Sequence, residues 1–216
     1  MDSRDISTVL PSGTTADRSA VARRGRTLQY VTIAWNSAEC VVALIAGFGA
    51  GSVALVGFGF DSAIEVTSSL AALWRLRRDT DEARETAERR ALRVIGVCFL
   101  FLAVYVLYDA VGSLVRGLPP DRSVIGIVVA ALSLVVMPVL ARAKRRIATR
   151  LDSGALEAET RQTEICAYLS AILLVGLGLN AWLGWWWADP VAGLLMVPLI
   201  GREGWEAMRG RTCCSY

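Results

Sequence analysis

Long apolar runs separated by charged segments restrict this chain to one class of fold. Runs of about 20 apolar residues can cross a bilayer as helices, which satisfy their own backbone hydrogen bonds. The alternating pattern of a membrane β-barrel is absent, and 54% of the residues are hydrophobic. We therefore expect an all-α membrane protein with six transmembrane helices. They are predicted at about residues 28–47, 52–73, 94–115, 124–141, 162–183 and 191–200, the last being the shortest.

Arginine and lysine are distributed unevenly between the connecting segments. They crowd the N-terminal segment, the loops after the second and fourth runs, and the C-terminal segment. By the positive-inside rule, both termini are predicted to be cytoplasmic. The stretch 142–146 is interpreted as a basic stop signal, followed by a loop that continues to Glu159. The predicted domains are a disordered cytoplasmic tail (1–27), a six-helix transmembrane domain (28–205) and a short cytoplasmic tail (206–216).

Two carboxylates, Asp61 and Glu65, lie in the second apolar run. Their spacing of four residues places them on the same face of a helix. On insertion scales, a charge at the centre of a membrane helix costs about 2.5–3.5 kcal/mol. No Lys or Arg is predicted inside the membrane to pair with them, which favours a role in binding a metal ion or protons. A buried, hydrogen-bonded pair without a ligand is the alternative.

The sequence limits the ligands that a metal site can use. It contains no histidine, so any metal ligand must be a carboxylate, amide, hydroxyl or thiol. Asn36 and Glu39 share a face of the first predicted helix. They are expected to orient ligands or relay protons, or else only to lock helices together by hydrogen bonds. The tail residues Cys213 and Cys214 could capture metal, carry palmitoyl groups or have no role.

Several short motifs resemble the transmembrane domain of the cation diffusion facilitators, the cation efflux family, whose members are divalent-metal/proton antiporters. A glycine-rich turn is followed by Ser52-Val53-Ala54-Leu55, which leads to Asp61 with an acidic residue four positions later. Ala188-Asp189-Pro190 opens the last run, and Arg202-Glu203-Gly204 closes it. The resemblance extends from about Leu28 to Glu206.

In that family a second pair of ligands lies on the fifth span, four residues apart. The matching positions here are Gln162 and Cys166, so the resemblance implies a metal site of Asp61, Glu65, Gln162 and Cys166. A thiolate at Cys166 would favour zinc or cadmium over manganese or magnesium. Glu164 lies about 200° around the helix from Gln162 and could join the site only through an irregular first turn.

The resemblance predicts a metal/proton antiporter that exports zinc-like divalent ions, in the plasma (inner) membrane of a prokaryote. Burial disfavours charged carboxylates, so protons can replace the metal at one site. The expected partners are the lipid bilayer, the metal ion, protons and a second copy of the chain, with no nucleic acid and no tightly bound cofactor. The family's soluble C-terminal domain is not expected here. No catalytic constellation is visible, so an enzyme is not expected.

Two other functions remain open at this stage. One is a proton-coupled exporter of small molecules, which would need a large, aromatic-lined cavity. The other is a membrane metal sensor or accessory protein that does not transport. The antiporter interpretation requires that Asp61 and Glu65 face the interior of the protein, close to the start of the fifth helix.

Overall fold

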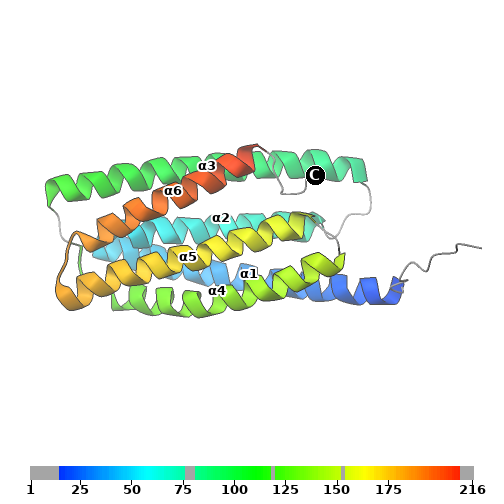
Figure 1. Cartoon of the computed structure of the whole chain (residues 1–216), viewed down its shortest axis with the longest axis horizontal. Coiled ribbons are helices and arrows are strands. Elements are labelled where there is room, and N and C mark those ends of the chain that lie inside the picture. The colour runs from blue at the N-terminus through cyan, green and yellow to red at the C-terminus, as the bar shows by residue number, and fades with distance from the viewer. Residues whose placement is uncertain (1–14, 76–80, 118–119, 152–153, 210–216) are drawn as a thin grey trace, which may run out of the picture.

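The computed structural model describes residues 15–75, 81–117, 120–151 and 154–209. Within these ranges the chain forms helices and no strands, and the helices lie side by side along the long axis of the molecule (Figure 1). The all-α prediction is confirmed. Cys213 and Cys214 lie outside the described residues. The helices are α1 (Thr15–Ala50), α2 (Val53–Arg75), α3 (Asp81–Arg116), α4 (Val124–Leu151), α5 (Gly154–Leu183) and α6 (Ala188–Met208).

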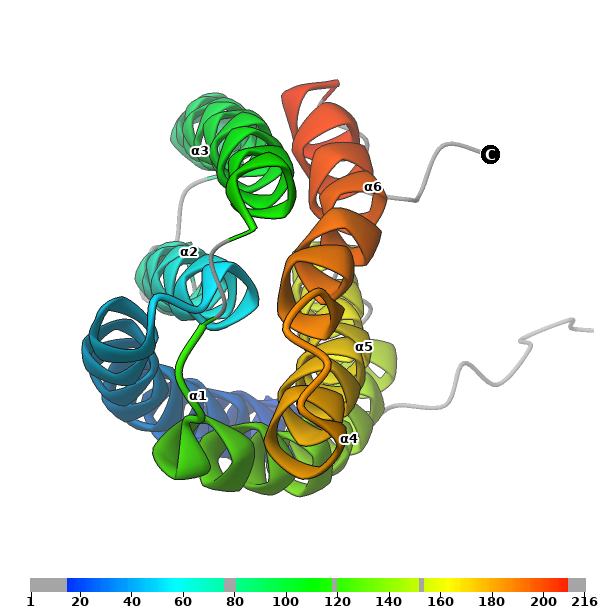
Figure 2. The same cartoon turned by 90° about the vertical axis from the view of Figure 1, so that its left-hand side faces the viewer.

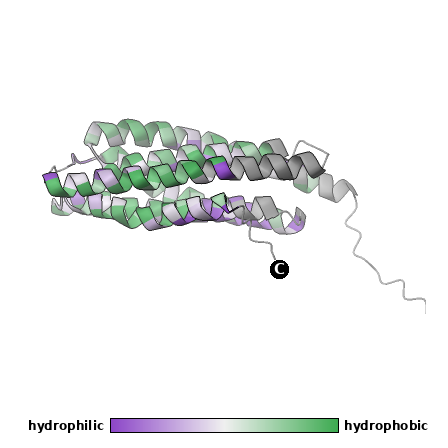
Figure 3. Ribbon diagram, turned by 90° about the horizontal axis from the view of Figure 1, so that it is seen from above, coloured by the Kyte–Doolittle hydropathy of each residue, from purple (hydrophilic) through white to green (hydrophobic). Residues whose placement is uncertain are grey.

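Among the described residues, five helices contain a segment that is long and apolar enough to cross a membrane. The segments are Arg23–Ala50, Val53–Ala71, Gly96–Arg116, Val124–Arg150 and Glu159–Leu183. Large apolar side chains cover their outer faces; Phe101 is 72% exposed and Trp182 is 85% exposed. Such a surface suits lipid rather than water. Apolar residues dominate most of the bundle's length, and polar ones gather at one end (Figure 3).

Successive helices run in opposite directions along the bundle (Figure 1). The first described residue of α1 and the last of α6 therefore lie towards the same end of the bundle. That both termini are cytoplasmic stays a prediction.

The helices extend beyond the predicted apolar runs. α1 begins at Thr15, inside the segment that was expected to be a disordered tail, and α4 continues through the basic stretch 142–146 to Leu151. The two extensions pack together, because Val21 and Gly25 are buried and a Cβ atom on Gly25 would lie 3.4 Å from Ile147. The apolar runs therefore predict the membrane-spanning part of each helix, but α1 and α4 continue beyond these runs where their extensions pack against each other.

Viewed end-on, the bundle divides into two parts (Figure 2). α1, α2, α4 and α5 form one group, and α3 packs mainly against α6 beside it. α2 is central, with 61% of its apolar segment buried against 28% for α3. Buried polar side chains gather in the four-helix group. In the described residues α3 carries none of them, and α6 carries only Asp189 at its start.

Asp189 caps the N-terminus of α2 from the start of α6. One carboxylate oxygen accepts a hydrogen bond from the Ser52 hydroxyl (2.5 Å), and the other accepts one from the Val53 backbone N–H (3.0 Å). The Ser52 hydroxyl also accepts from the Leu55 backbone N–H (3.1 Å). A negative charge is favourable at a helix N-terminus, and the cap satisfies donors that a helix start leaves free. Two of the short motifs singled out in the sequence therefore meet in one structural contact.

Glycines allow close contacts between helices within this chain. A Cβ atom on Gly96 of α3 would lie 2.7 Å from the backbone oxygen of Gly204 on α6, and one on Gly59 of α2 would lie 2.8 Å from the side chain of Leu44 on α1. Small residues at such crossings let membrane helices pack closely. These two glycines therefore form contacts between helices of one chain. They give no evidence for contacts between two chains, so the homodimer stays a prediction.

Candidate metal-binding site

Asp61 and Glu65 face the interior of the bundle. Their exposed fractions are 4% and 1%, although both lie on a helix that crosses the apolar part of the molecule. The geometric requirement of the antiporter interpretation is therefore met on α2. One oxygen of Glu65, Oε2, is buried without a hydrogen-bond partner in the protein.

α5 brings Cys166 against both carboxylates. The Cys166 side chain is buried and lies beside Asp61 and Glu65. Gln162, one turn earlier, is half-buried, and its side-chain nitrogen is enclosed without a hydrogen-bond partner. The structure thus places Asp61, Glu65 and Cys166 near one another inside the bundle, and Gln162 lies one turn before Cys166 on α5.

Lys144 corrects the expectation that no cation pairs with these acids inside the membrane. It belongs to the stretch that was interpreted as a basic stop signal, yet it is fully buried (0% exposed). Its ammonium nitrogen lies 3.7 Å from Oε1 of Glu65. The same nitrogen donates a hydrogen bond to the Thr163 hydroxyl (2.9 Å), which in turn donates to Oε1 of Glu65 (2.7 Å).

Glu159 is the main partner of Lys144. Its Oε1 accepts from the Lys144 ammonium group and from the Ser69 hydroxyl, each at 2.9 Å, and its Oε2 accepts from the Gln29 amide. All of these side chains are buried. They come from four different helices and form what we call the Lys144 cluster. Its members are Gln29, Glu65, Ser69, Lys144, Glu159 and Thr163.

The spacing of buried residues along α4 and α5 predicts that Lys144 and Glu159 face the interior, although local hydropathy does not. The buried residues of α4 recur every three or four positions, and Lys144 continues the series. α5 shows the same spacing from Glu159 onward. Extending this periodic pattern of buried positions beyond the last apolar residue of each run predicts that Lys144 and Glu159 are buried. The two series are Ala130, Ser133, Met137, Ala141, Lys144 and Ala148, and Glu159, Thr163, Cys166, Ser170, Leu173 and Leu177.

The predicted second layer on α1 is also buried. Glu39 accepts a hydrogen bond from the hydroxyl of Ser62 (2.9 Å), the residue after Asp61, while its other oxygen has no hydrogen-bond partner. The amide nitrogen of Asn36 donates to the Thr32 backbone oxygen (3.1 Å), one turn earlier on the same helix. Glu39 therefore links α1 to α2 beside the candidate ligands. Its participation in proton transfer stays a prediction.

Glu164 is turned away from these groups. It forms an ion pair with Arg145 at the surface between α4 and α5. In the described part of the chain, no three His, Cys, Asp or Glu side chains are arranged so that they could jointly hold a metal ion. Because Glu65 is engaged by Thr163, binding of a metal at the four predicted residues would require their side chains to rearrange.

The comparison with known families agrees with this arrangement. The model of the cation efflux transmembrane domain matches residues 30–210, which include every candidate ligand. The chain belongs to the cation efflux family.

Bacterial relatives extend the comparison. The chain is 26% identical to the cation-efflux pump FieF of Klebsiella pneumoniae over 187 residues, which cover 82% of this chain and 62% of that protein. It is 26% identical over 151 residues to a protein named as an uncharacterized transporter in Synechocystis, covering 67% and 49%. The chain thus spans less than two thirds of the length of these relatives. The bacterial relatives and the apolar helices agree with the predicted location in the inner membrane.

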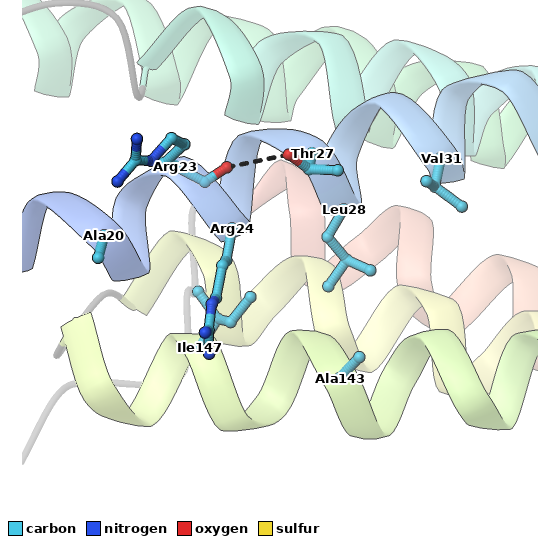
Figure 4. A pocket seen from close by; sticks show the side chains of 8 residues that line it. All are labelled: Ala20, Arg23, Arg24, Thr27, Leu28, Val31, Ala143 and Ile147. Atoms are coloured by element: carbon cyan, nitrogen blue, oxygen red, sulfur yellow. Dashed lines mark hydrogen bonds between the residues drawn. The ribbon is translucent and has the colours of Figure 1, made fainter.

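A surface pocket of about 550 Å³ lies between α1 and α4, apart from the acidic site (Figure 4). No Asp or Glu lines it, and no member of the Lys144 cluster does. It also lacks the aromatic lining that was expected for an exporter of small molecules. The lining residues are Ala20, Arg23, Arg24, Thr27, Leu28, Val31, Ala143 and Ile147.

Proposed function

We propose that this chain carries divalent metal ions across the membrane in exchange for protons, and that it exports zinc-like ions from the cytoplasm. The observation that carries the proposal is the enclosure of Asp61 and Glu65 inside the bundle, with the buried Cys166 side chain beside them. Membership of the cation efflux family supports it. Transporters commonly place such sites within the membrane, between their helices.

The ligand types favour zinc or a similar ion. Zinc binds thiolates and carboxylates, whereas magnesium and manganese prefer sites made of oxygen atoms. Gln162 would add an amide oxygen from the same stretch of α5. Metal binding would release protons from these groups, because ligands bind metals in their deprotonated forms. One site would then exchange a metal ion for protons.

Reconstituted vesicles test the proposal. The purified chain is placed in vesicles that contain a pH-sensitive dye, and a pH gradient is imposed. Zinc, cadmium, cobalt, iron and manganese are then compared in parallel. The wild type is expected to couple zinc or cadmium movement to proton movement, and Asp61→Asn is expected to abolish both.

Glu164→Gln is the matched control, because it removes a carboxylate from α5 at a surface ion pair instead of the candidate site. It should transport like the wild type. Undiminished metal-dependent proton flux in Asp61→Asn would contradict the proposal. Metal flux that does not depend on the pH gradient would contradict the antiport step alone.

A further inference from the structure

The Lys144 cluster sets the charge of the candidate site. Asp61, Glu65 and Glu159 supply three carboxylates, all buried, and Lys144 supplies one buried ammonium group. When these four groups are ionised and the neighbouring Glu39 is neutral, two negative charges remain, which a divalent ion would neutralise. A buried charge needs such compensation, because desolvation is costly.

Lys144 lies closer to Glu159 than to Glu65. Its nitrogen lies 2.9 Å from Glu159 and 3.7 Å from Glu65. Glu159 receives further hydrogen bonds from Ser69 and Gln29, so it is held from several sides. Glu65 receives one from Thr163, and its Oε2 is buried without a hydrogen-bond partner. Glu65 is therefore the less firmly held acid and has an oxygen available for a ligand.

We propose that Lys144 is an internal competitor of the transported metal ion. Its ammonium group stabilises Glu65 while the site contains no metal, and an incoming ion must displace this interaction to reach the carboxylate. Glu159 is the group that restrains Lys144 and keeps it from pairing more closely with Glu65. This proposal rests on the function proposed above, and it makes Lys144 and Glu159 positioning residues that set metal affinity.

A competitor and a simple counter-ion predict different results. If Lys144 only compensates the charge of Glu159, neutralising both residues together should leave the affinity for metal unchanged. If Lys144 competes for Glu65, the same double variant should bind metal more tightly, because no cation remains beside Glu65. The single variants Lys144→Gln and Glu159→Gln should then act in opposite directions.

The test measures equilibrium binding of zinc and of cadmium to the purified full chain in detergent by dialysis. Lys144→Gln is expected to bind about tenfold more tightly, since it loses a repulsive charge close to the metal. Glu159→Gln is expected to bind more weakly, because Lys144 then turns to Glu65. Lys144→Gln/Glu159→Gln is expected to resemble Lys144→Gln. In vesicle transport, Lys144→Gln should lower KM and also kcat, because release is slower.

Arg145→Gln is the matched control, because it removes the neighbouring cation, whose partner Glu164 lies at the surface. It should bind metal like the wild type. A double variant with wild-type or weaker affinity would overturn the role of Lys144 as a competitor. If the wild type binds metal and Asp61→Asn does not, the proposed function survives that result. If the wild type shows no Asp61-dependent binding, the proposed function itself fails.

Discussion

Replacing Asp189 with alanine tests whether this residue stabilises the fold by capping the N-terminus of α2. The carboxylate accepts hydrogen bonds from the Ser52 hydroxyl and the Val53 backbone N–H, and all three residues are buried. Loss of an N-cap costs about 0.5–2 kcal/mol, and a buried donor left without an acceptor costs about 1–3 kcal/mol. We therefore expect Asp189→Ala to lower the free energy of unfolding by about 2–4 kcal/mol.

Reversible unfolding in mixed detergent micelles measures this difference. Asp189→Asn should lose less than the alanine variant, because the amide oxygen can still accept one of the two hydrogen bonds. Asp121→Ala is the matched control: Asp121 is exposed in the neighbouring turn, and its own backbone N–H bonds to the Ala50 oxygen. If Asp189→Ala proved as stable as Asp121→Ala, the capping argument would be refuted.

Three further variants test packing, ligation and the link between α1 and α2. Gly96→Ala should destabilise the chain by about 1–3 kcal/mol, because the new Cβ would lie 2.7 Å from the facing backbone of α6; Gly49→Ala, with open space around it, should not. Cys166→Ser should reduce cadmium transport more than manganese transport, as compared in one vesicle assay, and equal losses would contradict thiolate ligation. Ser62→Ala should cost about 1–3 kcal/mol in unfolding experiments, because Glu39 loses its hydrogen bond; unchanged stability would contradict this estimate.

The inward position of Asp61 and Glu65 could be predicted from the sequence because two independent patterns agree. Their spacing places them on one face of a helix, and their charge excludes the lipid-facing side. Cys166 followed from the family resemblance, and the structure brings it to both acids. The all-α fold class could also be predicted from the sequence, because apolar runs long enough to span a bilayer form transmembrane helices.

Lys144 and Glu159 were predicted to lie outside the buried part of the bundle. The basic run that contains Lys144 was interpreted only as an orientation signal, and Glu159 was assigned to the loop that follows it. In the structure the same run has two faces. Arg142, Arg145 and Arg146 are exposed, while Lys144 points inward between them. The local average of hydropathy cannot separate these faces, whereas the spacing of buried positions can.

The division of polar groups explains why the inward lysine is tolerated. In the described residues, the buried polar side chains of the helices lie almost entirely on α1, α2, α4 and α5, and α3 contributes none. A buried lysine without an acidic partner would cost several kcal/mol. At its actual position it meets Glu159, Thr163 and Glu65. The cation is therefore stable only where the acids are, and any change that moves or neutralises one of these groups alters the charge that an incoming metal ion would encounter.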